Sequence, residues 1–252
     1  MSSEDSDDDS LTVVDLFCGC GGFSKGFVDA GFDVLAGVDV WDKAIETYNK
    51  NNDHEGLCKD LTKYTPKDFE KDTKIKKFDV LIGGIPCQGF SMGGKRDVND
   101  KRNNLFLEYI KYLNHFKPKA FLIENVIGIL SMKNKDGELV KDLMMEELTK
   151  KYNCEIYKLS AKDFDVPQNR RRVIFMGIRK DLKIKPTEPK VVTKNPIAVK
   201  TVLLKKDDVD KKYFLSERAI DGINKKKEKM KKKKYGFGAQ FLDMEKPIFK
   251  II

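Results

Sequence analysis

From Leu11 onward the chain alternates short apolar runs with longer amphipathic segments. This alternation is typical of parallel βαβ units, in which each strand is covered by the helix that follows it. The sequence therefore predicts an α/β fold. The expected strands are 12–17, 32–38, 78–82, 119–124, 155–160 and 172–178, and the expected helices are 24–30, 41–49, 105–113, 140–151 and a short one at 214–223.

Length and cysteine usage limit the class of protein. The chain has 252 residues, of which 40% are apolar, which is enough for a globular core. Its five cysteines form no disulfide-like framework, and no apolar N-terminal segment suggests secretion. We therefore expect an intracellular protein, in the cytoplasm or nucleus depending on its source. No stretch reaches the roughly 20 apolar residues that cross a bilayer, so we expect no membrane partner.

The charge distribution divides the chain into three parts. Residues 1–10 form an acidic, serine-rich tail that we expect to be disordered. The formal net charge of +9 is compatible with a polyanionic partner such as DNA or RNA. Lysine is concentrated in residues 225–234, which are either a solvated run or a phosphate-contacting one. We place a boundary near 180–200, so that 11–180 forms the folded domain and 181–252 a lysine-rich extension.

A glycine-rich turn follows the first expected strand. The segment 15–23 reads Asp-Leu-Phe-Cys-Gly-Cys-Gly-Gly-Phe, and its glycines let the backbone approach a ligand at a helix N-terminus. The third glycine of the dinucleotide-binding spacing is missing. A pyrophosphate and a small carboxylate-bearing ligand, such as the methionyl part of S-adenosylmethionine (AdoMet), both suit such a turn.

Acidic residues follow the next two strands. Asp39 lies about 20 residues after the glycines, at the spacing of a carboxylate that binds ribose hydroxyls. Its alternative role is the N-cap of the helix that follows. Asp60 comes after Cys58 and a further short strand expected between Asp39 and Asp60, and is placed to reach an adenine amino group; its alternative is a cap or a turn.

A second pair of strand ends carries reactive groups. Cys87 follows Pro86 at the end of an apolar strand, where a thiol is exposed at the open edge of a sheet. Its alternative is a small buried apolar residue. Glu124, beside Asn125, ends another apolar strand, where a carboxylate can donate or share a proton with a substrate. The alternative for Glu124 is a helix cap or a salt-bridge partner.

Arginines precede the last strand of the folded domain. Three arginines on alternating faces are typical of a solvated strand edge, but Arg170 and Arg172 point the same way by strand periodicity, and two guanidinium groups on one face can bind a phosphate and a pyrimidine carbonyl. We predict no metal site. Cys18 and Cys20 lie one residue apart without a second cysteine pair, which fits no structural zinc pattern.

Taken in order, four motifs resemble those of the cytosine-5 DNA methyltransferase family. They are Asp-Leu-Phe-x-Gly-x-Gly-Gly at 15–22, Pro-Cys-Gln at 86–88, Glu-Asn-Val at 124–126 and Gln-x-Arg-x-Arg at 168–172. The resemblance implies a doubly wound, mostly parallel sheet of the AdoMet-dependent methyltransferase (Rossmann-like) type. It also implies that residues 11–180 bind AdoMet, that S-adenosyl-L-homocysteine (AdoHcy) is the product, and that double-stranded DNA with a flipped cytosine is the partner.

The resemblance also implies residue roles. Cys87 attacks carbon 6 of the flipped cytosine, while Glu124 hydrogen-bonds or protonates ring nitrogen 3. Pro86 fixes the direction of the thiol. Arg170, Arg172 and Asn125 complete the catalytic group. The expected cofactor-binding residues are Asp15, Phe17, Gly19, Gly21, Gly22, Asp39, Val40, Asp60, Leu61 and Leu105.

The resemblance ends before the family pattern is complete. No counterpart of the target-recognition region or of the late cofactor segment follows residue 177, so 181–252 is expected to begin an incomplete recognition region. A two-chain enzyme, a truncated product and a chain lacking its remainder all explain this, and we slightly favour a second polypeptide. The alternative functions are a catalytically incomplete DNA-binding or regulatory module and an RNA cytosine-5 methyltransferase. The biological role, restriction-modification or another, stays open.

Overall fold

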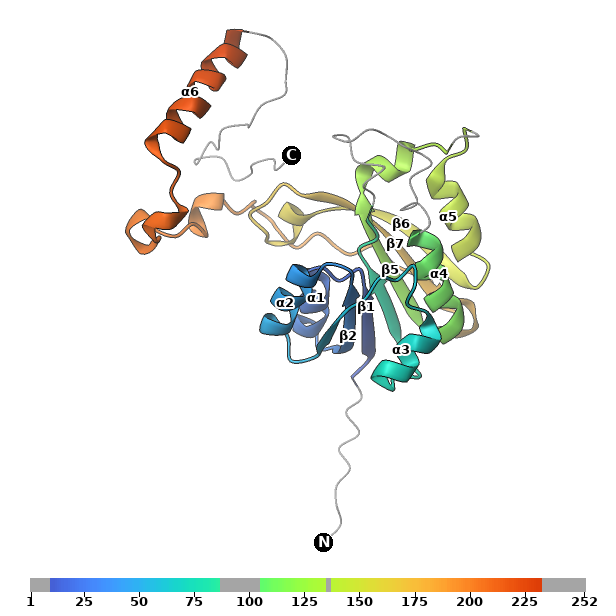
Figure 1. The fold of residues 1–252 in the computed structure, drawn as a ribbon. Coiled ribbons are helices and arrows are strands. Elements are labelled where there is room, and N and C mark those ends of the chain that lie inside the picture. The colour runs from blue at the N-terminus through green and yellow to red at the C-terminus, as the bar shows by residue number, and fades with distance from the viewer. Residues whose placement is uncertain (1–9, 87–104, 135–136, 233–252) are drawn as a thin grey trace. The chain divides into compact units, whose positions relative to one another are not determined.

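The structure is a computed structural model that describes residues 10–86, 105–134 and 137–232 (Figure 1). Within these ranges, no helix combines the length and the apolar character needed to cross a bilayer. The chain divides into two compact units by its internal contacts. The first consists of residues up to Leu159 together with Arg172–Pro189, and the second of Ser160–Arg171 together with residues from Lys190 onward.

In the described part of the chain, one sheet of seven strands forms the centre of the first unit, in the order β3-β2-β1-β4-β5-β7-β6 (Figure 1). The strands are β1 (Thr12–Leu16), β2 (Asp33–Asp39), β3 (Glu55–Cys58), β4 (Val80–Gly83), β5 (Ala120–Val126), β6 (Tyr152–Ser160) and β7 (Arg171–Arg179). The helices are α1 (Gly22–Asp29), α2 (Asp42–Asn51), α3 (Pro66–Thr73), α4 (Leu105–Phe116), α5 (Val140–Leu148) and α6 (Glu217–Lys232).

The strand directions confirm the predicted fold class. Strands β1 to β5 pair in parallel, whereas β7 runs antiparallel to β5, with Val126 opposite Arg172. In the same pair Phe121 faces Gly177, and its ring occupies the space that a Cβ at Gly177 would need. The sheet is therefore mostly parallel, with the strand order on both sides of β1 that a doubly wound fold requires.

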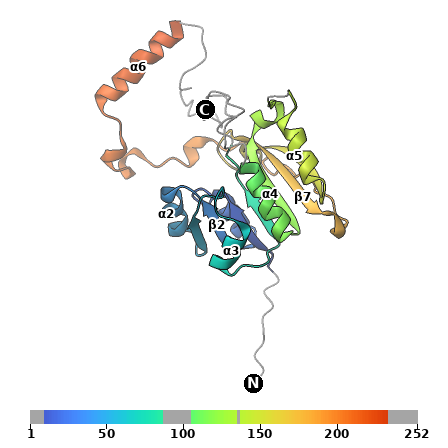
Figure 2. The same ribbon diagram turned by 45° about the vertical axis from the view of Figure 1, so that its right-hand side comes forward.

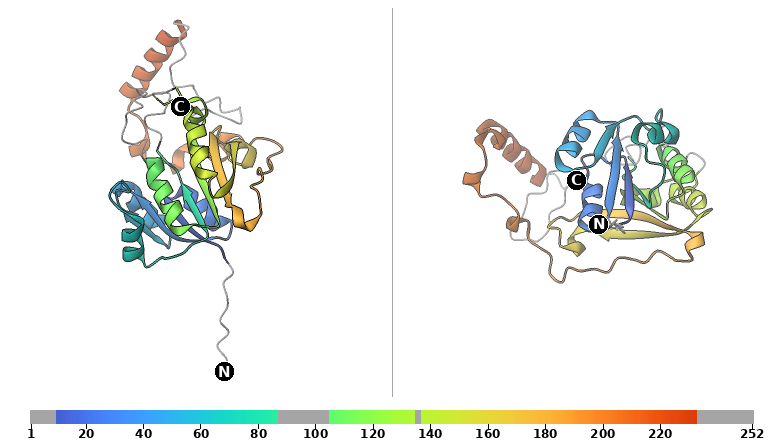
Figure 3. Two further views of the ribbon diagram at one scale, coloured as in Figure 1. Left: turned by 90° about the vertical axis from the view of Figure 1, so that its right-hand side faces the viewer. Right: turned by 90° about the horizontal axis from the view of Figure 1, so that it is seen from below.

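Helices cover both faces of the sheet. Because side chains alternate along a strand, Val13 of β1 packs with Phe23 and Phe27 of α1, whereas Val14 and Leu16 belong to the larger core on the opposite face. That larger core includes Phe69 of α3, Tyr109 and Leu113 of α4, and Met144 and Leu148 of α5. Figure 2 shows α3, α4 and α5 along this face, and Figure 3 shows α1 and α2 on the other.

Most helices lie within three residues of the expected bounds, and α3 and α6 differ most from the sequence expectation. Helix α3 was not expected, although it starts with a capping box in which Thr65 and Asp68 exchange hydrogen bonds and has Pro66 in its first turn. Helix α6 begins at Glu217, three residues later than expected at 214, and continues to Lys232 instead of ending at 223. Lysine is a good helix former, so the lysine run extends the helix that precedes it.

The second unit has its own local contacts. The short helix Ala161–Phe164 is held by the backbone N–H groups of Val192 and Thr193, which both donate to Asp163 O. The Thr193 hydroxyl donates to the Asp165 carboxylate at 2.8 Å. The division of function between 11–180 and 181–252 remains a prediction.

Candidate active site

The carboxyl ends of the parallel strands bring several of the predicted site residues of the first unit to one edge of the sheet. Backbone hydrogen bonds connect these ends: Cys18 N donates to Val38 O at 3.1 Å, and Lys59 N donates to Asp39 O at 2.8 Å. In open α/β sheets, ligands bind at this edge beside the point where the strand order reverses. Here that point lies between β1 and β4.

The first turn is open on the side where a ligand would approach. Phe17, Gly19 and Gly21 all have positive φ, and Gly21 N closes the turn by donating to Cys18 O at 3.0 Å. A Cβ at Gly19 or Gly22 would meet nothing within 4 Å in the described structure. The turn therefore leaves its backbone accessible to a ligand.

Asp39 connects the ends of β1 and β2. Its Oδ2 accepts from Gly19 N and its Oδ1 from Trp41 N, both at 2.9 Å. Trp41, not Asp39, is the N-cap of α2, so the alternative role of Asp39 as that cap is wrong. Val40 and Trp41 are 66% and 63% exposed, which leaves two large apolar side chains next to this carboxylate.

The remaining predicted cofactor residues divide into accessible and buried ones. Asp60 Oδ1 accepts from Thr62 N and from the Thr62 hydroxyl, and these hydrogen bonds lower the pKa of the Asp60 carboxyl. These contacts form a turn, which was the alternative role of Asp60, and the residue remains half-exposed. Leu61 is buried in the main core, and Leu105, at the start of α4, packs against that core.

Asp15 is completely buried behind the turn. The Ser24 hydroxyl donates to its Oδ2 at 2.7 Å, while Oδ1 has no hydrogen-bond partner among the described residues. Burial, which disfavours the charged form, raises the pKa of Asp15 from 3.8 to about 7. Asp15 contacts Ser24 of α1, and because it is fully enclosed its carboxylate does not reach the open side of the turn.

The buried Asp15 carboxyl predicts a pH dependence of stability. The unfolded chain ionises Asp15 near 3.8 and the folded chain near 7, so the folded state is progressively penalised as pH rises through this window. We expect Asp15→Asn to gain about 3 kcal/mol in free energy of unfolding relative to wild type between pH 5 and pH 8, measured by urea denaturation.

Asp68→Asn is the control of opposite sign. Hydrogen bonds from Thr65 lower the pKa of the Asp68 carboxyl, so its ionised form stabilises the folded state. This stabilisation is present at neutral pH and disappears as the pH falls below the ordinary pKa of an aspartate. An Asp15→Asn advantage that does not change between pH 5 and pH 8 would contradict the assignment of the buried carboxyl.

The end of β4 is joined to the end of β5. Asn125 is 3% exposed, and its Nδ2 donates to Ile85 O at 3.5 Å. A Cβ at Gly84 would lie 3.9 Å from Glu124 Oε2 and 3.7 Å from Phe17 O. Pro86 follows in a half-buried position, and Cys87 lies outside the described residues. The strand end that leads to Cys87 therefore lies beside both Glu124 and the first turn.

Glu124 and Arg172 form an ion pair across β5 and β7. Arg172 Nε donates to Glu124 Oε1 at 2.6 Å. The Arg172 side chain is 26% exposed and the Glu124 side chain 28%. Arg170 precedes β7 and belongs to the second unit, where its carbonyl accepts from Ala161 N. The strand alternation expected for both arginines therefore applies to Arg172 alone.

Sequence reasoning missed two buried residues behind the turn. Ser24 and Tyr48 bond to each other, and Ser24 also bonds to Asp15. The helical spacing of Ala44, Ile45 and Tyr48 indicated only a core face. No local pattern shows that the Tyr48 hydroxyl would meet a serine 24 residues away.

The residues present at this edge are chemically compatible with AdoMet. The open glycine turn leaves room for a ligand close to the backbone, and the half-exposed carboxylates of Asp39 and Asp60 can accept hydrogen bonds from groups such as ribose hydroxyls and an adenine amino group. In the ranges that the structure describes, no group of three or more His, Cys, Asp or Glu side chains is placed to hold a metal ion.

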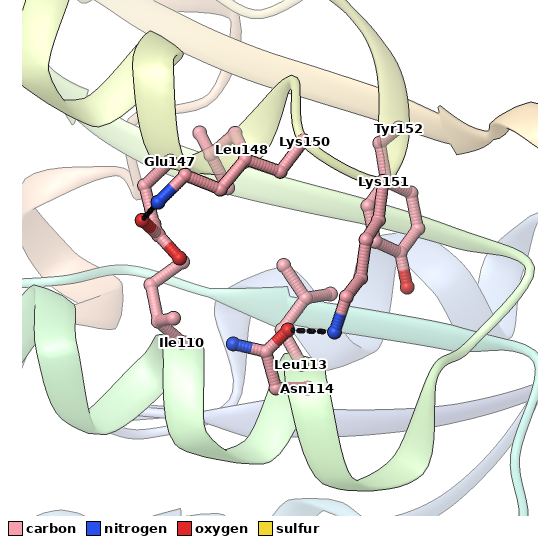
Figure 4. Close-up of a pocket in the computed structure, with 8 residues that line it drawn as sticks. All are labelled: Ile110, Leu113, Asn114, Glu147, Leu148, Lys150, Lys151 and Tyr152. Atoms are coloured by element: carbon pink, nitrogen blue, oxygen red, sulfur yellow. Dashed lines mark hydrogen bonds and ion pairs between the residues drawn. The ribbon is translucent and has the colours of Figure 1, made fainter.

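A hollow of about 190 Å³ lies elsewhere, between the C-terminal end of α4 and the start of β6 (Figure 4). The Lys151 ammonium donates to Asn114 across it, and Lys150 pairs with Glu147 at its rim. Because α4 ends where β5 begins, this hollow is at the amino edge of the sheet. It is therefore separate from the candidate active site.

Comparisons with known proteins agree with this geometry. The sequence model of the C-5 cytosine-specific DNA methylase family matches residues 11–250. Type II methyltransferase M.DdeI of Desulfomicrobium norvegicum is 41% identical over 73% of this chain and 43% of its own length. Type II methyltransferase M.FnuDI of Fusobacterium nucleatum is 38% identical over 86% of this chain and 59% of its own length.

A solved structure shares the fold. The putative DNA modification methyltransferase encoded within an Escherichia coli prophage superposes with a TM-score of 0.63 at 31% identity, covering 75% of this chain and 53% of that one. The chain spans about half the length of the proteins it matches. The family match extends over most of the sequence, and the chain belongs to the C-5 cytosine-specific DNA methylase family.

Proposed function

We propose that this chain transfers a methyl group from AdoMet to carbon 5 of a cytosine in DNA. The observation that carries the proposal is the meeting of two groups of residues at one sheet edge. The first turn and Asp39 lie at the ends of β1 and β2, and Pro86, Asn125 and the Glu124–Arg172 pair lie at the ends of β4, β5 and β7. A methyl donor and a base would thus be held next to each other.

Each reacting group has a role in the proposed chemistry. The Cys87 thiolate forms a bond to carbon 6 of an extruded cytosine, and Glu124 supplies a proton at ring nitrogen 3, so that the ring charge is neutralised and carbon 5 becomes nucleophilic. Bound AdoMet supplies the electrophilic methyl group that carbon 5 accepts. AdoHcy is then the leaving group; loss of the carbon-5 proton to a base supplies the electron pair that expels Cys87 as thiolate, and ring nitrogen 3 returns its proton to Glu124.

Arg172 positions the acid in this proposal. Its guanidinium bonds to Glu124 Oε1 and so fixes the carboxyl, leaving Oε2 on the side of Gly84. We also place Arg170 on the target nucleotide and Asp39 and Asp60 on the cofactor nucleoside, in the roles that the resemblance implies. A buried or half-buried guanidinium is suited to this work because it remains charged and presents several donors in a fixed plane.

Target recognition is proposed to lie outside residues 11–180. The relatives that match this chain are about twice as long as the matched part. We propose that a polypeptide segment outside the described fold, on this or a second chain, reads the DNA sequence. A role in restriction-modification is proposed by analogy with the type II methyltransferases named above.

The test uses duplex DNA that contains 5-fluorocytosine in many sequence contexts. Because fluorine at carbon 5 cannot leave as a proton does, methyl transfer leaves the nucleophile attached to the base. We expect an AdoMet-dependent covalent complex through Cys87, formed by the full chain with a polypeptide that carries the remaining part of a relative, and weakly or not at all by the chain alone.

Three outcomes distinguish the alternatives. Trapping on fluorinated RNA but not on DNA would support an RNA methyltransferase. AdoHcy binding without any trapped complex, even with the added polypeptide, would indicate a catalytically silent module and would contradict the proposal. Efficient, sequence-specific trapping by the chain alone would refute the proposed need for a further segment.

A further inference from the structure

Tyr48 of α2 fills a slot that three glycines leave open. Its side chain is fully buried. Helix α2, to which it belongs, covers one face of the sheet together with α1 (Figures 1 and 3). A Cβ at Gly21, Gly37 or Gly56 would lie 2.9, 2.5 or 2.7 Å from the Tyr48 ring. These residues belong to the first turn, to β2 and to β3, so a single aromatic ring packs against three neighbouring segments.

The Tyr48 hydroxyl lies in a chain of hydrogen bonds behind the first turn. It is 3.0 Å from Ser24 Oγ and 2.7 Å from His54 Nε2. Ser24 has a single O–H and donates it to Asp15 Oδ2, so Ser24 Oγ accepts from the Tyr48 hydroxyl and the Tyr48 oxygen accepts from His54 Nε2–H. The four groups therefore form one directed network, in which each bond polarises the next.

This network supports the part of the turn that faces a ligand. Ser24 lies in the first turn of α1, and Gly21 directly precedes that helix with a φ of 90°. The front of the turn is open at Gly19 and Gly22, whereas its back rests on Tyr48. On the other side Gly19 N is held by Asp39, so the turn is fixed between a carboxylate and a tyrosine.

Resting on the proposed function, we infer that Tyr48 is a positioning residue whose hydroxyl holds residues 17–22 in the shape that receives AdoMet. Three residues of this turn adopt left-handed backbone conformations. Two of them are glycines, which can adopt many other backbone conformations. Without the hydroxyl, Ser24 and His54 lose a buried partner, and the turn is no longer fixed from behind. Part of the binding energy is then used to order the turn.

Tyr48→Phe tests this inference, because phenylalanine keeps the ring in its slot and removes only the hydroxyl. We expect the dissociation constant of the full chain for AdoHcy, measured by calorimetric titration, to rise about tenfold. When the chain is combined with the polypeptide that carries the remaining part of a relative, we expect KM for AdoMet to rise, while kcat at saturating AdoMet stays within about twofold of wild type.

Tyr112→Phe is the matched control. Tyr112 is also a buried tyrosine, 1% exposed, and its hydroxyl donates to Tyr64 O at 3.0 Å on the opposite face of the sheet. We expect both variants to lower the melting temperature by a comparable amount, but only Tyr48→Phe to weaken AdoHcy binding. Equal weakening in both variants, or none in Tyr48→Phe, would overturn the inference.

A measurement without cofactor separates this inference from the proposed function. In the ligand-free chain, Tyr48→Phe is expected to speed amide hydrogen exchange of a peptide spanning residues 16–24 about tenfold, with no such change in Tyr112→Phe. Unchanged exchange contradicts the positioning role. A wild-type chain that fails to bind AdoHcy contradicts the proposed function and the cofactor part of the inference together, whereas normal wild-type binding with an unaffected variant contradicts the inference alone.

Ser24→Ala checks that the hydroxyl acts through the network. Because Ser24 connects Tyr48 to Asp15, its removal breaks the same chain of hydrogen bonds. The double variant Ser24→Ala, Tyr48→Phe is expected to bind AdoHcy within about twofold of the weaker single variant. If the loss of AdoHcy affinity in the double variant equalled the product of the two single losses, the two residues would act independently, which would contradict the proposed network.

Discussion

Cys87→Ser is expected to abolish methyl transfer, lowering the single-turnover rate by at least about 10³-fold, while AdoHcy affinity stays within about twofold of wild type. A serine hydroxyl at neutral pH is far less nucleophilic than a thiolate, so the adduct at carbon 6 does not form. The residues that lead to position 87 are fixed independently of the sulfur, since Ile85 is buried and its carbonyl accepts from Asn125.

The control for this prediction is Cys154→Ser. Burial raises the pKa of the Cys154 thiol to about 12, so this cysteine stays protonated and is no nucleophile. We expect the control to retain methyl transfer when both variants are assayed with 5-fluorocytosine duplexes and the complementing polypeptide. A trapped adduct in the Cys87→Ser chain would place the nucleophile elsewhere.

Glu124→Gln is expected to slow adduct formation about 10²-fold, because the amide carries no proton that can be given to ring nitrogen 3. Glutamine has nearly the same shape and still offers Arg172 an oxygen acceptor, so the ends of β5 and β7 should remain paired. The rate is measured as single-turnover trapping on 5-fluorocytosine DNA with saturating AdoMet. A ground-state binding defect is detected separately, as a change in DNA affinity.

Glu70→Gln provides the comparison. Glu70 is 32% exposed, close to the 28% of Glu124, and likewise has a basic partner, His115 at 3.1 Å near the opposite edge of the sheet. We expect this variant to trap DNA at the wild-type rate. If Glu124→Gln also retained the wild-type rate, the acid would have to be another group, and Glu124 would be only the structural partner of Arg172.

Much of the fold was predictable because its signals are local. The apolar runs at Thr12–Leu16 and Val80–Gly83 are strands as expected, since continuous apolar residues bounded by turns suit a strand buried on both faces. The amphipathic spacing of Tyr109, Ile110 and Leu113 likewise gave the buried face of α4. Helix α3 was not predictable from apolar periodicity, because its eight residues bury a single side chain, Phe69.

The candidate site was only partly predictable. The sequence identified Asp39 and Glu124 because each ends a strand, and their positions follow from strand direction alone. It did not distinguish the accessible carboxylate of Asp39 from the enclosed one of Asp15, because exposure depends on what the neighbouring helix places over a strand. It also gave no sign that Arg172 would pair with Glu124, a contact made by two antiparallel strands 48 residues apart.

The sequence by itself determined the family and most of the strands and helices, though not α3, because motif spacing and apolar periodicity depend on residues close together in the chain. Only the tertiary structure decided which side chains meet. The Tyr48 ring among three glycines, the buried network behind the first turn and the Glu124–Arg172 pair all join segments that are distant in sequence. Packing, not local preference, brings such groups together, so no single stretch of the chain specifies them.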